Sequence, residues 1–293
     1  MHRRMARVAI VSDTTAYLPA NVVEQNDIRL VSLYVNFSGD MLREADVADY
    51  PAFFDRLRSA DEMPTTSQPS VGDFLAVYEP LLAQGRDIVS IHISVGLSGT
   101  SEAARQAAEA LQRDGKGGER VNVLDSSTAA GGLGMVVLAA AKRAAAGGDA
   151  EAVLARAREA REALKMWFAI DTLEFLKRSG RIGAASAWIG STLKIKPILT
   201  VESEISPVER VRTSARAFDR MVDYARQRHE SGADGWVVQH IQSDEQGREL
   251  TNRCREIFES EPAFYSEIGP VLAVHTGPGL LGVGAVPARM FDG

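Results

Sequence analysis

The chain has 293 residues, of which 45% are hydrophobic, so it can form one large or two medium domains with a substantial core. Its net charge of −6 argues against sequence-independent nucleic-acid binding, and its single cysteine, Cys254, excludes an internal disulfide and a cysteine-based metal site. The sequence has no apolar run of about 18 residues, and its basic start lacks a signal-type apolar core, so we expect a cytoplasmic protein without a membrane span.

The first part of the chain alternates predicted strands and helices. Apolar, β-branched runs predict strands at residues 7–11, 28–37, 88–93 and 120–124. Helical spacing of apolar residues predicts helices at 48–58, 72–84, 101–111, 131–146 and 151–165. Pro80 lies inside the second of these, so we expect that helix to kink or to end early. This alternation predicts a parallel, Rossmann-like sheet, with ligands bound beyond the carboxyl ends of its strands.

Polar turns follow three of these strands, at residues 12–15, 94–100 and 125–128. In the first turn, Asp13 or Thr14 can cap the next short helix or line a crevice above the sheet. The second turn, SVGLSGT, joins a strand to a helix N-terminus, where free N–H groups and the helix dipole favour a negative group. The alternative is that Ser98 is only the cap of that helix.

Residues 64–70, PTTSQPS, form a polar segment framed by two prolines. The prolines forbid a regular helix across it. The segment is therefore either a plain connector or a loop that presents hydroxyl donors to a ligand.

The second part has a different pattern of elements. We expect strands at 166–170, 197–201, 205–211 and 235–241, and helices at 172–178, 184–193, 215–228 and 248–258. The turn at 202–204 predicts a hairpin, and 178–183 is a basic glycine turn. Residues 269–279 fit a short helix with Pro270 at its first position, a strand being the alternative, and 283–286 is expected to close a sheet. These elements predict an α/β region with a mixed or antiparallel sheet.

Three stretches, TTSQP at 65–69, GLSGT at 96–100 and HTGPG at 275–279, form a specific combination. Together with residues 12–15 and 178–183, they resemble the DegV family from about residue 7 to the end of the chain. The resemblance implies an N-terminal α/β domain at 7–165 and a C-terminal α+β domain at 166–293, with a ligand tunnel between them. Members often have a serine where this chain has Val95, and an Asp-Gly turn where it has Ser203-Glu204.

The family is similar to the fatty-acid-binding subunits of the bacterial fatty acid kinase. The resemblance implies that the chain holds one long-chain fatty acid and presents its carboxylate to a separate ATP-dependent kinase subunit, which makes an acyl phosphate. It further implies a non-catalytic subunit without a cofactor, and we expect a monomer when the chain is alone.

The resemblance also assigns site residues by position. The hydroxyls of Thr66 and Ser98 hold the carboxylate, with His275 in the same network. The full set that it implies for fatty-acid binding is Thr65, Thr66, Ser67, Ser98, Gly99, His275 and Thr276. Arg178, Arg181 and Arg212 are candidates for contact with the kinase or the head group, the alternative for the first two being a solvated surface.

A serine hydrolase that uses Ser98 and His275 is the alternative function. Ser98 follows a strand and precedes a helix, but the G-x-S-x-G motif requires glycine at the position of Thr100, and no acid partner is identifiable. His275 can instead be a core histidine bonded only to backbone. The histidines show no metal-ligand spacing, and neither G-x-G-x-x-G nor a P-loop motif is present, which argues against metal and nucleotide sites.

Overall fold

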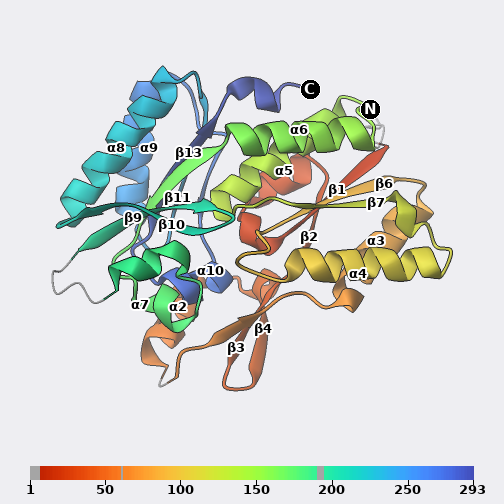
Figure 1. Cartoon of the computed structure of the whole chain (residues 1–293), viewed down its shortest axis with the longest axis horizontal. Helices are drawn as coiled ribbons and strands as arrows, with labels where there is room; N and C mark the ends of the chain where they lie inside the picture. Colours follow the sequence, from red (N-terminus) through yellow and green to blue (C-terminus); the bar gives the residue numbers. More distant parts are fainter. Residues whose placement is uncertain (1–6, 61, 190–194) are drawn as a thin grey trace.

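The structure is a computed structural model that describes residues 7–60, 62–189 and 195–293. The described residues form a four-stranded, a six-stranded and a three-stranded sheet (Figure 1). The four-stranded and six-stranded sheets lie on opposite sides of α5 (Ala130–Ala145), which packs against strands of both. No helix in the described ranges is long and apolar enough to cross a membrane.

The four-stranded sheet is parallel throughout, as predicted. Its order is β2-β1-β6-β7, formed by β1 (Val8–Asp13), β2 (Ile28–Val31), β6 (Asp87–His92) and β7 (Val121–Asp125). Side chains alternate along β1, so Ala9 and Val11 face one layer of helices and Val8 and Ile10 face the other. Both faces of the sheet are therefore covered, as parallel sheets require.

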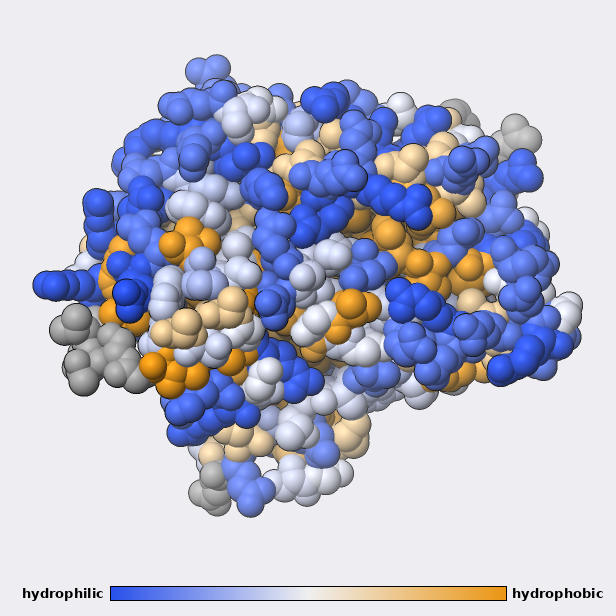
Figure 2. All heavy atoms as spheres, viewed as in Figure 1, coloured by the Kyte–Doolittle hydropathy of each residue, from blue (hydrophilic) through white to orange (hydrophobic). Residues whose placement is uncertain are grey.

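Helices cover this sheet on its two faces. α3 (Val71–Ala83) and α4 (Thr100–Arg113) pack on one face, and α5 and α6 (Ala150–Ala163) pack on the other, while the short α1 (Ala20–Gln25) lies beside β2. A capping box starts α3, because Ser70 and Asp73 bond each other's backbone N–H groups. In Figure 2 the exposed side of α4 is mainly hydrophilic, which fits its amphipathic sequence.

The six-stranded sheet is mixed, in the order β10-β9-β8-β13-β11-β12. Its strands are β8 (Lys165–Ala169), β9 (Lys196–Glu202), β10 (Glu204–Val211), β11 (Gly235–His240), β12 (Phe264–Glu267) and β13 (Leu281–Val286). Only the β11–β12 pair is parallel. α8 (Ser214–Glu230) and α9 (Asp244–Phe258) cover one face. The expected fold class, a parallel-sheet α/β region followed by a mixed-sheet region, is confirmed.

A third, antiparallel sheet was not predicted. It has the order β4-β3-β5, with β3 (Tyr34–Phe37), β4 (Asp40–Arg43) and β5 (Thr65–Ser67). The single extended stretch expected at 28–37 is in fact β2 and β3, which belong to different sheets. The polar segment at 64–70 contains β5, which pairs Thr66 with Val35. α2 (Tyr50–Ser59) falls within the helix predicted at 48–58, apart from its last residue, and buries Phe53, Phe54 and Leu57.

Several boundaries differ from the predictions. α3 does not end early: it continues through Pro80 to Ala83, because its apolar face stays buried and the Pro80 carbonyl still accepts from the Gln84 N–H. The helix expected at 184–193 is a 3₁₀ helix at Gly183–Trp188, and residues 190–193 of that prediction lie outside the described residues. β13 does not close the sheet, because it pairs with β8 and β11 on its two sides.

Two short helices complete the part of the fold that surrounds the site. α7 (Glu174–Arg178) packs against α10 (Pro270–Thr276). Pro270 occupies the first turn of α10, and Gly277 follows its end with a φ of 75°, so the helix alternative for 269–279 is correct and the strand alternative is wrong.

Candidate ligand-binding site

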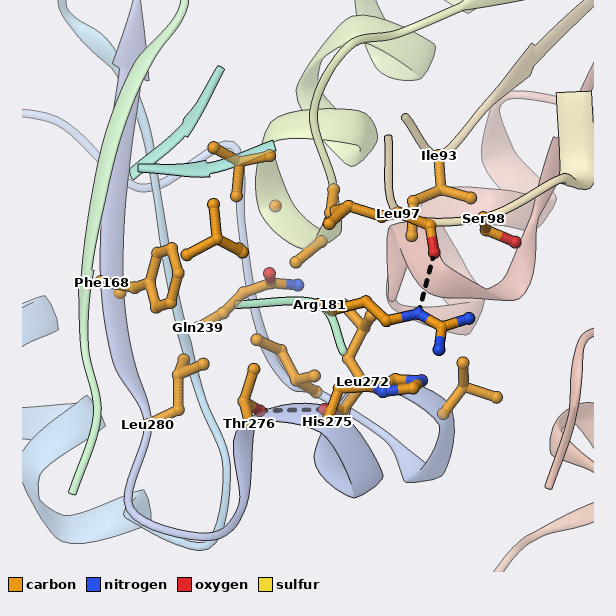
Figure 3. A pocket seen from close by; sticks show the side chains of 18 of the residues that line it. Ile93, Leu97, Ser98, Phe168, Arg181, Gln239, Leu272, His275, Thr276 and Leu280 are labelled. Carbon is orange, nitrogen blue, oxygen red and sulfur yellow. Dashed lines mark hydrogen bonds between the residues drawn. The ribbon is translucent and has the colours of Figure 1, made fainter. Parts of the chain in front are cut away.

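A cavity of about 310 Å³ lies between the four-stranded and the six-stranded sheet. Its wall is mostly apolar and includes residues from the six-stranded sheet, from the loop that follows β6, from α5 and from α10 (Figure 3). Examples are Ile93, Leu97, Phe168, Leu272 and Leu280. A concave apolar space with a few polar groups at one end is the usual form of a small-molecule site.

The cavity is hollow because small residues occupy positions that face it. Gly282 and Gly284 of β13 line the cavity, whereas Leu281 and Ala285 pack with α8 and α9 on the other face. A Cβ at Gly284 would lie 2.9 Å from the Cβ of Met166, so even alanine would crowd this wall. Glycine at alternate positions of a central strand therefore leaves room that larger side chains would fill.

One end of the cavity is polar, and three distant segments form it. Thr66 comes from β5, Ser98 from the loop between β6 and α4, and His275 from α10. Thr66 Oγ1 and His275 Nε2 are 2.7 Å apart, and Ser98 Oγ lies 2.9 Å from Oγ1 of Thr100. Each pair has two N–H or O–H protons, and the hydrogen bond within the pair uses only one of them. The other proton can therefore be donated to a ligand.

The N-terminus of α4 opens at this end of the cavity. Gly99 is the N-cap residue and no side chain caps the helix, so the alternative in which Ser98 is only a helix cap is wrong. The first N–H groups of α4 and its dipole therefore favour a negative group near Ser98. A Cβ at Gly99 would overlap the Gln68 amide, so the two polar loops are in close contact here.

His275 is neutral at physiological pH. Burial, and to a lesser extent the positive charge of Arg181, lower its pKa to about 4. Arg181 lies at the polar end, where its Nη1 donates to the Ser179 carbonyl at 2.7 Å and its Nε to the Leu97 carbonyl at 3.4 Å (Figure 3). His275 Nδ1 is buried and has no hydrogen-bond partner. A neutral imidazole beside a fixed guanidinium suits an anionic ligand.

Buried carboxyl groups hold the loops that carry these side chains. Asp13 accepts from the Thr15 N–H at 3.1 Å, as the capping prediction required, and it is not part of the cavity wall. Its other oxygen lies 3.0 Å from His92 Nδ1 and accepts from the Ile93 N–H at 3.0 Å. Asp13 thus joins the carboxyl ends of β1 and β6 just before the Ser98 loop.

A second buried carboxyl, that of Glu44, anchors the start of α10 and was not predicted as functional. Its Oε1 accepts from the Val271 N–H at 2.8 Å and from the Tyr17 hydroxyl at 2.6 Å. Burial raises its pKa to about 7. Glu44 therefore acts as an N-terminal anchor for the helix that carries His275.

The hairpin turn at Ser203-Glu204, which departs from the family pattern, contacts two loops of the parallel sheet, those at 94–100 and 125–128. Ser203 adopts a φ of 69°, and its N–H donates to the Ser127 carbonyl at 2.9 Å. Its own carbonyl accepts from the Ser94 hydroxyl. Val201 and Ile205, on either side of the turn, line the cavity, so the turn fixes this wall.

The structure brings most of the predicted site residues to the cavity, but not all of them. The predicted residues that line it are Thr66, Ser67, Ser98, Gly99, Arg181, His275 and Thr276. The Thr276 hydroxyl donates to the Leu272 carbonyl of its own helix at 2.9 Å (Figure 3). Thr65, Arg178 and Arg212 are exposed and are not part of the wall, and Arg178 pairs with Glu174 at 2.7 Å.

The geometry does not support the hydrolase alternative. His275 Nε2 contacts Thr66, and its Nδ1 has no acid partner among the described residues. Ser98 contacts Thr100 instead of the imidazole. The described ranges also contain no group of three or more His, Cys, Asp or Glu side chains suited to a metal ion.

Sequence reasoning missed Gln68 and Gln239, which also line the cavity. Gln68 lies in the recognised TTSQP stretch, so its proximity to the threonines was an available signal. Gln239 follows the apolar run Trp236–Val238 in a buried strand, where an amide is a signal in itself.

Comparisons with known proteins agree with this fold. The sequence matches the family described as "Uncharacterised protein, DegV family" over residues 7–288. A DegV domain-containing protein of Streptomyces coelicolor is 37% identical over 279 residues, which are 94% of this chain and 97% of that protein. A structure from Thermus thermophilus, described as fatty acid binding of a DegV family protein, is 34% identical, covers 97% of this chain and 100% of its own, and has a TM-score of 0.85. The crystal structure of Bacillus subtilis DegV, described as a fatty acid binding protein, is 30% identical with coverages of 96% and 100% and a TM-score of 0.85.

Proposed function

The chain belongs to the DegV family, and we propose that it binds one long-chain fatty acid in the cavity between its two larger sheets. The observation that carries this proposal is an apolar cavity that ends at Thr66, Ser98 and His275. In this proposal residues 7–165 and 166–293 form two domains with the ligand tunnel between them. The related proteins from Thermus thermophilus and Bacillus subtilis that are described as binding fatty acids support it.

The tail supplies most of the affinity. Burial of each methylene group contributes about 0.8 kcal/mol, so a tail of about 15 methylene groups contributes about 12 kcal/mol before the costs of ordering. A hydrogen bond to a charged carboxylate contributes about 1.5–3 kcal/mol net. The polar end therefore sets the orientation of the ligand more than its affinity.

The carboxylate accepts hydrogen bonds from the hydroxyls at the polar end. His275 in its Nε2–H form donates to Thr66 Oγ1, which leaves the Thr66 proton for one carboxylate oxygen. Ser98 and the N-terminus of α4 serve the other oxygen, and Arg181 adds positive charge at the same end. Because His275 is neutral, it forms no ion pair with the carboxylate, whose negative charge is not neutralised by an imidazolium.

The bound carboxylate is presented to a separate ATP-dependent kinase subunit. One carboxylate oxygen attacks the terminal phosphorus of ATP, the bond to the bridging oxygen breaks, and ADP leaves with an acyl phosphate formed. In this scheme the chain contributes binding and orientation but no catalytic group. Arg178 and Arg212 are exposed and lie outside the cavity wall, which suits contact with the partner subunit.

The first test asks whether fatty acid is present. Protein purified from a bacterial host is analysed by native mass spectrometry, and the delipidated protein is titrated with octadecanoic acid. We expect one fatty acid per chain in the first measurement and saturable one-to-one binding in the second. Protein that is folded, empty and unable to bind added fatty acid would refute the proposal.

The second test addresses presentation. Protein, fatty acid, ATP and magnesium are incubated with and without a DegV-associated kinase subunit. Acyl phosphate is expected only when the kinase subunit is present. Formation of acyl phosphate without it would show that the chain itself is the kinase, and rapid ester hydrolysis abolished by Ser98→Ala would favour the hydrolase.

A further inference from the structure

Gln239 is a buried amide in the wall of an apolar cavity. It belongs to β11, its side chain is 3% exposed, and its Oε1 has no hydrogen-bond partner. In Figure 3 it extends into the cavity between Phe168 and Leu280 on one side and Ser98 and His275 on the other. It therefore lies along the proposed path of the acyl tail, away from the carboxylate end.

Hydrogen bonds fix which way the amide points. The Gln239 Nε2 donates to Ser266 Oγ at 2.8 Å, and Ser266 Oγ donates its single proton to the Tyr17 carbonyl at 2.6 Å. Ser266 can therefore only accept from Gln239, so the NH₂ group must face Ser266. The carbonyl oxygen is left on the opposite side, facing the cavity wall.

The neighbours of this buried oxygen do not satisfy it, although Gln239 lines the cavity. It lies next to Gly131, where a Cβ would be 2.9 Å from Oε1, and next to Val237. The residue paired with Gln239 across the sheet is Gly282, which also lines the cavity without a side chain. A buried acceptor without a donor is unfavourable, so its retention points to a donor supplied by the ligand.

We propose that Gln239 selects long-chain fatty acids that carry a hydroxyl group within the chain, with the hydroxyl donating its proton to Gln239 Oε1. This inference rests on the proposed fatty-acid binding and names the substrate class of the same cavity. An acyl chain has no other common donor at this depth, because its carboxylate is held at the Thr66 end. A site that hydrogen-bonds a ligand hydroxyl discriminates by leaving its own polar group unpaired when the hydroxyl is absent.

The test compares the delipidated protein with octadecanoic acid and with a series of monohydroxyoctadecanoic acids whose hydroxyl stands at successive mid-chain carbons. The methyl ether of each isomer keeps the oxygen but removes the donor, and the ketone offers an acceptor only. We expect one or two adjacent isomers to bind about two- to twelvefold more tightly than their methyl ethers, the range that a neutral hydrogen bond supports.

Two variants separate the proposed role from a purely structural one. Gln239→Leu keeps the size of the side chain and removes the acceptor, so the preference for the hydroxyl over the methyl ether should disappear. Ser266→Ala lies outside the cavity wall and removes only the group that orients the amide. The freed amide can turn its NH₂ group inward, so this variant should shift the preference toward the ketone.

The outcomes are distinguishable. If octadecanoic acid fails to bind the folded wild type, the proposed function is wrong and this inference with it. If octadecanoic acid binds but every hydroxylated isomer binds no better than its ether, the inference alone is wrong. If Gln239→Leu and Ser266→Ala lower the unfolding free energy without changing the hydroxyl-to-ether ratio, Gln239 serves only to tie β11 to Ser266, and the inference is likewise overturned.

Discussion

Thr66→Val is the substitution that best separates binding from presentation. Valine has nearly the shape of threonine and suits β5, so the pairing of this strand with β3 should be kept. The change removes Oγ1, which contacts His275 Nε2 at 2.7 Å and is proposed to donate to the carboxylate. Loss of one hydrogen bond to a carboxylate costs about 1.5–3 kcal/mol, which is a factor of about 10 to 150 in Kd. Against about 12 kcal/mol of gross burial of the tail, this loss leaves a protein that still binds lipid.

Phosphoryl transfer should suffer more than retention of lipid. A reacting oxygen that is misplaced by about 1 Å can lose about a hundredfold in rate. The assay is paired: fatty acid retained per protein, and acyl phosphate formed with saturating kinase subunit. Thr65→Val is the matched control, because Thr65 is the exposed neighbour in the same strand and does not line the cavity. If folded Thr66→Val protein retains no lipid, or if it retains lipid and full transfer, the assignment of Thr66 to orientation is wrong.

Three further substitutions test other parts of the site. Ser98→Ala should retain lipid but lose transfer at least tenfold in the same paired assay, whereas Ser101→Ala, which removes a buried hydroxyl without a partner in the first turn of α4, should leave both unchanged. Burial favours the protonated form of Glu44 and raises its pKa from 4.5 to about 7, so its contribution to stability is complete below pH 4.5 and is lost as the pH rises through 7. In urea unfolding, the unfolding free energy of the wild type should therefore fall relative to that of Glu44→Gln by about 3 kcal/mol across that interval. Parallel pH profiles of the two proteins would contradict this. Asp13→Ala leaves the buried N–H groups of Thr15 and Ile93 without their acceptor and removes the partner of His92 Nδ1, so it should lower the unfolding free energy by at least about 2 kcal/mol. Ser12→Ala, whose buried hydroxyl has no partner, should change it by less than about 1 kcal/mol.

Local sequence signals predicted the parallel sheet well. A β-branched run followed by Asp13 identified both β1 and the cap of the turn after it. Pro270 and Gly277 marked the two ends of α10. The membership in the DegV family that the three short motifs indicated is confirmed by the match over residues 7–288. In each case the deciding physics acts within a few residues, so it is visible in the sequence.

The missed features depend on contacts between distant segments. β5 has only three residues, which no periodicity can identify, and it exists because Thr66 pairs with Val35. β13 was expected only to close a sheet, because a local pattern does not show that it pairs with β8 on one side and β11 on the other. Arg178 and Arg181 are close in sequence, yet one pairs with Glu174 at the surface and the other reaches the cavity. α7 ends between the two residues. The sequence alone does not show that the first would lie at the surface and the second at the cavity.

The dependence of the site on distant segments has a consequence for function. His275 reaches the head-group end only through α10, and the start of α10 is anchored by Glu44 and Tyr17 from the first part of the chain. Thr66 reaches the same end only because β5 pairs with β3 of the third sheet. The groups that are proposed to hold the carboxylate therefore stay in place only while the two parts of the chain are packed together. A change that loosens this packing should impair orientation of the head group before it empties the cavity, because the tail contacts are many and individually small, whereas the polar contacts are few and depend on geometry.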